Sequence, residues 1–253
     1  MATDIEVTDP QLSVYVPVPK DGDGVCSICH GASTRGRMGT FYPTCYSCSR
    51  IPRLGVKTIV PISLVTTDGS QLYTALRDYK SSSIDHAVRA KHSLLIAATL
   101  QRFLREHGRC ISTAAGEEWN VITVVPSTRR LTGPHPLETA IVRIAQALSP
   151  QYRHLLSGTG EGVPRNEVND AAFVVADDEP LDDLRVLLID DTYTSGAHIQ
   201  SAAVALTKAG ASVVGAVAVG RVVGTHDDRY PEKEEMWTRQ RRIRFSFNDC
   251  CLE

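Results

Sequence analysis

The sequence has few aromatic residues, little net charge and no long hydrophobic run. Phe, Trp and Tyr make up 6% of the 253 residues, and the formal net charge is −2. Such a small net charge excludes a global attraction to nucleic acid or to a membrane surface. No apolar stretch reaches the roughly 20 residues of a membrane-spanning helix. The first 20 residues lack the basic flank and apolar core of a secretory signal, so we expect a cytoplasmic protein without a membrane partner.

The overall composition is that of a globular protein with an unusual number of cysteines. Hydrophobic residues make up 42% of the chain and charged residues 22%, and the length suits one large domain or two modest ones. Seven cysteines are present. An odd number in a chain without a secretory signal favours metal ligands or free thiols over disulfides.

Four of the cysteines form two pairs with the spacing of a structural zinc site. Cys26 and Cys29 form the first C-x-x-C pair, and Cys45 and Cys48 form the second. Each pair can make a tight turn that points two thiolates at one tetrahedral ion. A redox dithiol and four unconnected thiols are the alternatives, and His30 could replace one thiolate. Four cysteine ligands would leave no open coordination position, so we expect a structural zinc ion without catalysis.

The most informative stretch is a hydrophobic strand followed by two acids, a small-residue turn and a helix. Residues 186–189 are all aliphatic, which predicts a strand buried on both faces of a parallel sheet. Asp190 and Asp191 end this strand. Residues 192–196 are rich in Thr, Ser and Gly, and an Ala-rich helix then runs to Gly210. Backbone N–H groups and the helix dipole would converge on an anion at this turn, while the two carboxylates could accept hydrogen bonds from a diol.

This pattern closely resembles the phosphoribosyl-pyrophosphate (PRPP) motif of type I phosphoribosyltransferases. The resemblance implies that Asp190 and Asp191 hold the ribose hydroxyls. It also implies that the following turn binds the 5-phosphate through Thr192, Tyr193, Thr194, Ser195 and Gly196. An ordinary capped helix after a buried strand is the alternative interpretation. No Gly-Lys-Ser/Thr follows the strand, which argues against a Walker-type nucleotide loop.

A second predicted strand, residues 120–126, is followed by hydroxyl and guanidinium groups. Ligands bind beyond the carboxyl ends of strands in open α/β sheets, and guanidinium groups match phosphate oxygens. A basic, solvated loop is the alternative. Beside a PRPP motif, we expect a pyrophosphate site made by Ser127, Thr128, Arg129 and Arg130.

Residues 152–169 are polar, rich in glycine and without periodicity, which predicts a long loop. A loop of this length inside a compact domain is usually a functional lid or disordered. A lid suits the proposed chemistry, because a sugar cation must be kept from water during transfer. Arg153 and Arg165 are the candidate charges of this lid. Three histidines, His86, His92 and His107, have no ligand spacing and are expected on helix surfaces. The other predicted elements are strands over 58–67, 171–176 and 212–223, and helices over 72–80, 85–107 and 137–148. Pro61 indicates either an edge strand or a bulge.

Read together, three features resemble the ComF family of phosphoribosyltransferase-fold proteins. They are the cysteine ribbon, the Leu-Arg-Asp-Tyr-Lys helix end at 76–80, and the PRPP motif following the segment 165–173. The resemblance covers residues 26–221 and implies a twisted, mostly parallel sheet with flanking helices and a small hood. It implies that PRPP binds with Mg²⁺, and on family position alone it makes Lys80 a further contributor. The predicted organisation is a partly ordered leader (1–24), a zinc-ribbon module (25–55), a phosphoribosyltransferase domain (56–225) and a tail packed on it (226–253).

The leading functional hypothesis is transfer of the 5-phosphoribosyl group from PRPP to an unidentified nucleobase or amine-type acceptor, with release of pyrophosphate. A single-stranded nucleic-acid accessory protein of the ComF type is the second hypothesis. It draws on the ribbon and on a tail cluster made by Arg239, Arg241, Arg242 and Arg244. A PRPP or nucleotide sensor without catalysis is the third. The sequence leaves open whether the protein forms a homo-oligomer, and it assigns no general base. Cys250 and Cys251 either lie near the ribbon or are ordinary thiols.

Overall fold

The central strand of the fold is β5 (Arg185–Tyr193), and the two faces of this strand pack into two separate hydrophobic clusters. Leu187 and Ile189 belong to one cluster, and Val186 and Leu188 belong to the other. Four consecutive aliphatic residues are therefore buried because the strand is covered on both sides. The computed structural model describes residues 3–51, 55–129, 133–175, 181–225 and 229–253.

Four parallel strands form the main sheet, which confirms the predicted α/β class with a parallel sheet. Their order is β1-β6-β5-β2, with every neighbouring pair parallel. The predicted strands around 58–67, 120–126 and 212–223 are found as β1 (Thr58–Val65), β2 (Val121–Val124) and β6 (Ser212–Val222). As Pro61 suggested, β1 is the last strand on its side of the sheet. Its outer edge is met by the N-terminal segment, where the Leu64 N–H donates to the Val16 carbonyl at 2.9 Å.

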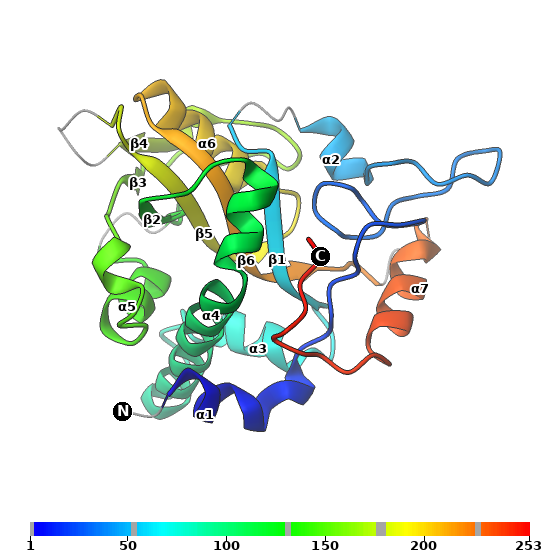
Figure 1. Ribbon diagram of the computed structural model, residues 1–253, viewed down its shortest axis with the longest axis horizontal. Coiled ribbons are helices and arrows are strands. Elements are labelled where there is room, and N and C mark those ends of the chain that lie inside the picture. The colour runs from blue at the N-terminus through cyan, green and yellow to red at the C-terminus, as the bar shows by residue number, and fades with distance from the viewer. Residues whose placement is uncertain (1–2, 52–54, 130–132, 176–180, 226–228) are drawn as a thin grey trace.

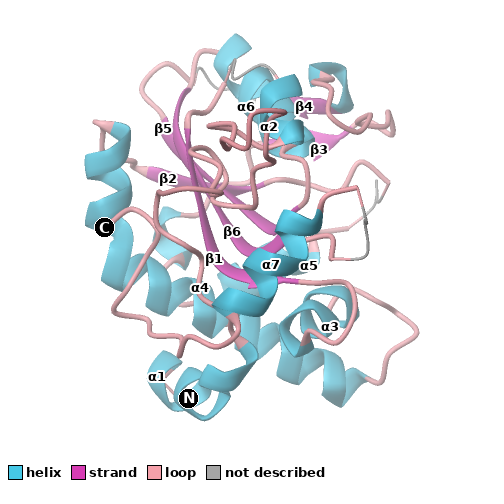
Figure 2. Ribbon diagram, turned by 90° about the vertical axis from the view of Figure 1, so that its right-hand side faces the viewer, coloured by secondary structure: helices cyan, strands magenta, loops and turns pink. Residues whose placement is uncertain are grey.

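Helices cover both faces of the sheet (Figures 1 and 2). One face carries α6 (Ala197–Lys208), which connects β5 to β6, together with the cysteine-rich segment. The opposite face carries α3 (Gln71–Asp78), α4 (His86–Ala115) and α5 (Pro136–Arg143). Among the described residues, no helix is both long enough and apolar enough to cross a membrane.

Two helices differ in length from the prediction. The long helix α4 continues eight residues beyond the predicted end at His107, from its cap at Asp85 to Gly116, whose φ of +75° ends it. The prediction of surface histidines is wrong for His107, which is 2% exposed because the C-terminal tail packs over this part of α4. Helix α5 is shorter than predicted and ends at Arg143.

The segment predicted as a lid is partly a strand. Tyr152 bridges to Ile122 on β2, and β3 (Leu156–Gly158) pairs antiparallel with β4 (Phe173–Val175) in a separate two-stranded sheet. The prediction of one continuous loop is therefore wrong for its first part, because Leu155 and Leu156 are buried in the core. The short 3₁₀ helices around this region span Ser149–Gln151 and Asp170–Ala172.

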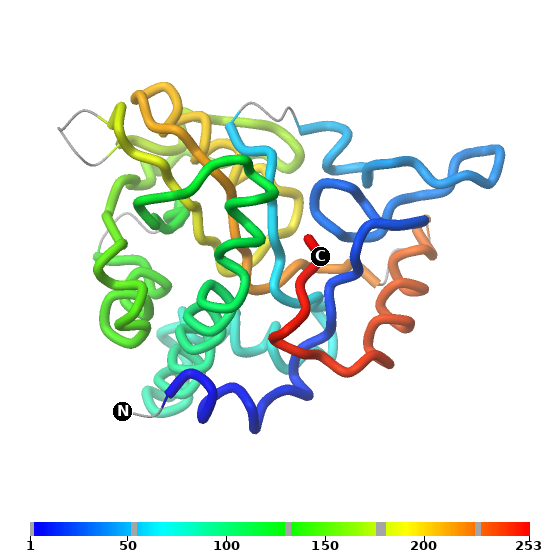
Figure 3. Tube along the Cα trace, in the orientation of Figure 1, coloured from blue at the N-terminus to red at the C-terminus, as the bar shows by residue number. Residues whose placement is uncertain are grey.

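Both ends of the chain pack on the same side of the sheet (Figure 3). The first helix, α1 (Asp4–Thr8), and a 3₁₀ helix (Asp9–Val14) lie along α4. The ring of Tyr15 stacks on Phe245 of the tail with centroids 4.8 Å apart, and its hydroxyl lies 2.6 Å from that of Thr99 on α4. The tail includes α7 (Pro231–Gln240).

Candidate functional site

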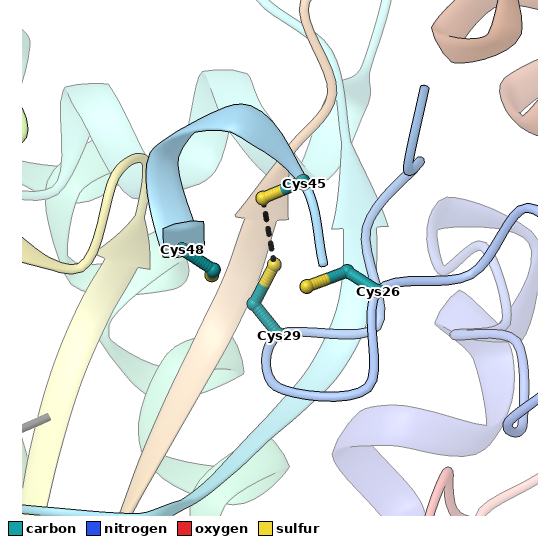
Figure 4. A group of neighbouring side chains, drawn as sticks. All are labelled: Cys26, Cys29, Cys45 and Cys48. Atoms are coloured by element: carbon teal, nitrogen blue, oxygen red, sulfur yellow. Dashed lines mark hydrogen bonds between the residues drawn. The ribbon is translucent and has the colours of Figure 1, made fainter. Parts of the chain in front are cut away.

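Four cysteine sulfurs, predicted from their spacing to form one metal site, lie together in the structure (Figure 4). The four atoms all lie within 4.8 Å of one another, and Sγ of Cys29 is 3.8 Å from Sγ of Cys45. A tetrahedral zinc ion with Zn–S bonds of about 2.3 Å places its sulfur ligands about 3.8 Å apart. All four thiols are buried. Cys26, Cys29, Cys45 and Cys48 can therefore hold a zinc ion.

Two short backbone turns produce this arrangement. In the first, the Cys26 N–H donates to the Gly31 carbonyl and the His30 N–H donates to the Cys26 carbonyl, at 2.8 and 2.9 Å. In the second, Cys45 is the N-cap of α2 (Tyr46–Arg50), which carries Cys48. His30 is buried, and its Nδ1 lies 3.6 Å from a carboxylate oxygen of Asp21 instead of joining the sulfur atoms.

A buried arginine connects the cysteine group to the turn after β5. Arg221, near the end of β6, is 7% exposed, and a Cβ on Gly31 would lie 2.7 Å from its Nη2. Its Nη1 donates to the backbone carbonyls of Thr194 and Val222 at 3.0 and 2.5 Å. Hydrogen bonds with Cys26 and Cys48 and, to a smaller extent, the charge of Arg221 lower the pKa of Cys29 to about 7, against the opposing effects of Cys45 and of burial. The charge of Arg221 thus favours the thiolate form of Cys29, and its guanidinium also holds the turn through the Thr194 carbonyl.

The turn itself is built over the ring of Tyr193. Gly196 has φ of +90°, and a Cβ at this position would lie 2.3 Å from the Tyr193 hydroxyl. The same hydroxyl lies 3.6 Å from Sγ of Cys48. Of the five residues predicted to bind the phosphate, Tyr193 and Ser195 are buried, Thr192 is half-buried and Thr194 is exposed. The Tyr193 side chain therefore supports the turn from below and does not face outward.

The first amides of α6 are available to a ligand. No side chain among the described residues caps this helix in the usual way; only a long contact of 3.4 Å joins the Ala197 N–H to Ser195 Oγ. The first N–H groups of a helix have no partner within the helix, and the dipole adds positive potential there. The helix start also carries the exposed His198. This end of α6 suits an anion.

The two carboxylates at the end of β5 have different surroundings. Asp191 is buried, and its Oδ2 accepts hydrogen bonds from Tyr79 Oη at 2.5 Å and Lys80 Nζ at 2.8 Å. Burial opposes ionisation of Asp191, but Lys80 and Tyr79 outweigh it and lower the pKa of this carboxyl. Asp190 is half-buried and forms no ion pair with any described residue. Burial and the charge of Asp191 raise the pKa of Asp190 to about 7.

Lys80 belongs to the site because it contacts Asp191, although the two residues are 111 positions apart in the sequence. Tyr79 was not predicted, although it stands beside Lys80 just after α3 ends at Asp78. The position of Tyr79 next to Lys80 is the one feature of the sequence that could have indicated its place in the site. Because Asp191 is engaged by these two side chains, Asp190 is the acid better placed to accept hydrogen bonds from a ligand.

The loop after β2 lies beside the start of α6, as expected for neighbouring parallel strands. Because β2 pairs with β5, the segments that follow the two strands start from the same edge of the sheet. Partial burial and, to a smaller extent, the positive charge of Arg129 lower the pKa of His198. Arg129 is exposed, Ser127 is half-buried and Thr128 is buried. Arg130, predicted with them, lies outside the described residues.

A small cavity adjoins this loop. It has a volume of about 60 Å³, and its lining includes Ser127, His135, Tyr152 and Ser157. His135 is the N-cap of α5, where its Nδ1 accepts a hydrogen bond from the Leu137 N–H at 3.2 Å. Two larger cavities, of about 350 and 630 Å³, lie by the C-terminal tail.

The two arginines predicted as lid charges occupy different settings. Arg153 is half-buried, and its backbone N–H donates to the Ile122 carbonyl on β2 at 3.0 Å. Arg165 is exposed in the loop over 159–169, where Asn166 has φ of +65°. Arg165 lies in the irregular loop after β3, and Arg153 lies in the short connection between Tyr152 and β3.

Comparison with known proteins does not add a family to these observations. No protein-family model matches the chain, and no curated protein matches it.

Proposed function

We propose that this protein is a ComF-like phosphoribosyltransferase that transfers the 5-phosphoribosyl group of PRPP to a nucleobase or amine-type acceptor. The observation that carries the proposal is the end of β5. There, a half-buried carboxylate, Asp190, stands next to a turn that leads into the uncapped start of α6. A carboxylate beside an anion site matches a ligand with hydroxyl groups next to a phosphate. Thr194 and the amides at the start of α6 bind the 5-phosphate, and Asp190 accepts hydrogen bonds from the ribose.

Transfer breaks the bond between the anomeric carbon and pyrophosphate, and the bonding electrons leave with the pyrophosphate oxygen. A lone pair of the acceptor nitrogen forms the new bond to that carbon, and the acceptor then loses a proton. The transition state has oxocarbenium character, so the protein contributes mainly positioning and charge stabilisation. Arg129, exposed in the loop after β2, and Arg130 stabilise the negative charge of the departing pyrophosphate.

Mg²⁺ fits this strand end because two carboxylates, Asp190 and Asp191, stand at neighbouring positions there, and carboxylate oxygens are among the ligands that Mg²⁺ prefers. When bound with PRPP, the ion supplies positive charge to the pyrophosphate. Mg²⁺ usually keeps several waters and substrate oxygens as ligands, so no protein ligand is assigned. Lys80 and Tyr79 keep Asp191 ionised and oriented beside Asp190.

The test is PRPP binding by calorimetry, together with pyrophosphate release in the presence of Mg²⁺ and a panel of nucleobases and amines. We expect binding by the wild-type protein and turnover with at least one acceptor. Asp190→Asn should lose at least about tenfold in affinity, because an amide replaces a charged acceptor at the ribose. Asp183→Asn, at an exposed position before β5, is the matched control and should bind normally. Failure of the wild-type protein to bind PRPP would refute the proposal.

The two other hypotheses predict different outcomes of the same experiments. Tight PRPP binding without turnover on any acceptor would favour a sensor. A nucleic-acid accessory protein would bind single strands in a salt-dependent manner. Arg239, Arg241, Arg242 and Arg244 are exposed, but the nearby Phe245 and Phe247 are buried and offer no surface for base stacking. This contrast favours the transferase.

A further inference from the structure

A second group of metal-ligand side chains lies away from the cysteine ribbon and from the end of β5. It contains His107 and Cys110 of α4 and Cys250 and Glu253 of the tail, and their ligand atoms all lie within 4.8 Å of one another. We propose that these four residues form a second zinc site, which fastens the C-terminal tail to α4. One imidazole, two thiolates and one carboxylate are a donor set that suits Zn²⁺.

Each segment presents its two ligands at a spacing of three residues. His107 and Cys110 are neighbours on one face of α4, as residues three apart on a helix are. In the tail, the Glu253 N–H donates to the Cys250 carbonyl at 3.4 Å, so a turn directs both side chains the same way. Figure 2 shows the C-terminal end of the chain beside α4. The two pairs lie about 140 residues apart in the sequence but meet in space.

The distances are close to those of a tetrahedral zinc site, in which neighbouring N, O and S ligands lie about 3.3 to 3.8 Å apart. Nδ1 of His107 is 3.7 Å from Sγ of Cys110 and 3.5 Å from Oε1 of Glu253. Sγ of Cys110 is 2.9 Å from the same Glu253 oxygen, as in a hydrogen bond from a protonated thiol. Binding of zinc releases that proton, and the two atoms then separate by about 0.6 Å.

The orientation of His107 supports its role as a ligand. Nε2 of this residue lies 2.8 Å from the backbone carbonyl of Phe247, which can only accept a hydrogen bond. The proton therefore sits on Nε2, and in the neutral ring Nδ1 carries a lone pair directed at Cys110 and Glu253. Metal-bound histidines commonly show this arrangement, in which the second nitrogen donates to a carbonyl or carboxylate. His107 and Cys250 are buried, and Glu253 lies on the exposed side of the group.

The test is the zinc content of the full chain, purified with a thiol reductant and measured by atomic emission. We expect two equivalents for the wild-type protein and one for the double variant Cys110→Ser/Glu253→Gln. The remaining equivalent, bound at the ribbon, would show that the double variant is folded. Cys251→Ser changes the neighbouring buried thiol and should keep two equivalents.

Cobalt(II) titration provides the second measurement, because the intensity of the sulfur-to-cobalt band reports how many thiolates bind. The wild-type protein should bind the ion in two steps, and the step with the weaker band should be lost in Cys110→Ser/Glu253→Gln. A single equivalent of zinc in the wild-type protein would overturn the proposal. So would a double variant with the same zinc content as the wild type, or a Cys110–Cys250 disulfide in the wild-type protein under the reducing conditions.

Discussion

The hydroxyl of Tyr193 lies 3.6 Å from Sγ of Cys48, so the turn after β5 rests directly on the cysteine group. Arg221 makes a second connection, because its guanidinium donates to the Thr194 carbonyl and its charge favours the thiolates. The proposed phosphate turn and the proposed zinc ion are therefore parts of one structural unit. We therefore expect loss of the metal to disturb the conformation of the turn and to weaken ligand binding there.

Cys45→Ser tests this connection, because it removes one zinc ligand and leaves Cys48, whose sulfur lies against Tyr193, unchanged. We expect the variant to lose the ribbon zinc and about 4 kcal/mol or more of unfolding free energy, as is typical when a structural metal is removed. PRPP affinity, measured below the melting temperature, should fall at least about tenfold. A folded, zinc-depleted variant with normal PRPP affinity would contradict the connection.

Gly196→Ala tests the packing of the turn on Tyr193. The substitution combines a positive φ with a contact of 2.3 Å between the new Cβ and the Tyr193 hydroxyl. Gly69→Ala is the matched control, because Gly69 has φ of +77° and nothing lies within 4 Å of its added Cβ. Both changes carry a backbone cost of about 1 kcal/mol. Gly196→Ala should lose a further 1 to 3 kcal/mol from overpacking, roughly, and should also lose PRPP affinity. Equal melting temperatures for the two variants would disprove this packing role.

The sequence predicted the features that are local in the chain. The aliphatic run before Asp190, the small residues after it and the two C-x-x-C pairs each lie within one short segment, and their periodicity or spacing follows from local geometry. The strands of the parallel sheet and the grouping of the four cysteines are confirmed for this reason. The roles of the PRPP-motif residues stay predictions until binding is measured.

Features that depend on distant contacts could not be predicted. Tyr79 meets Asp191 across 112 residues, and Arg221 joins the cysteine group to the turn from the next strand. Tyr79 belongs to the Leu-Arg-Asp-Tyr-Lys segment at 76–80, but this pattern does not show which residue Tyr79 contacts, and Arg221 belongs to no recognisable spacing. His107 was placed on a surface because the residues that surround it come from the tail, about 140 positions later. The strand at Leu156 was missed because two buried leucines within a polar segment are too short a signal.

Lys80→Met tests the ion pair with Asp191. Lys80 neutralises a buried carboxylate, but its own side chain is 38% exposed, so solvent weakens the pair and we expect a loss of about 1 to 2 kcal/mol at pH 7. The folded pKa of Asp191 lies below 3.8, so the stability contributed by the pair is present above that pH and is lost as the pH falls further. The difference between wild type and Lys80→Met in denaturant unfolding should therefore shrink in acid. Lys91→Met, at an exposed position on α4, should show no such difference.

Asp190→Asn should separate stability from ligand binding. The folded pKa of Asp190 is about 7, against an ordinary value of 3.8, so the unbound protein loses stability as the pH rises from about 4 to 7, because the carboxyl stays protonated in the folded state while it ionises in the unfolded chain. The amide carries no charge but still needs hydrogen bonds, so we expect Asp190→Asn to be about 1 to 3 kcal/mol more stable than wild type at pH 8. The gain should be much smaller at pH 5, where Asp190 is already protonated in the folded protein.

The same variant should bind PRPP less well, because hydroxyl groups of the ribose lose a charged acceptor. A carboxylate that lowers the stability of the free protein and raises its affinity for a ligand is a feature of a binding site, since structural acids are usually paired with a cation as Asp191 is with Lys80. Thermal melts at pH 5 and pH 8, with and without PRPP, measure both effects in one series. A variant less stable than wild type at both values of pH would mean that Asp190 is a structural residue, and the proposed ribose contact would then have no basis.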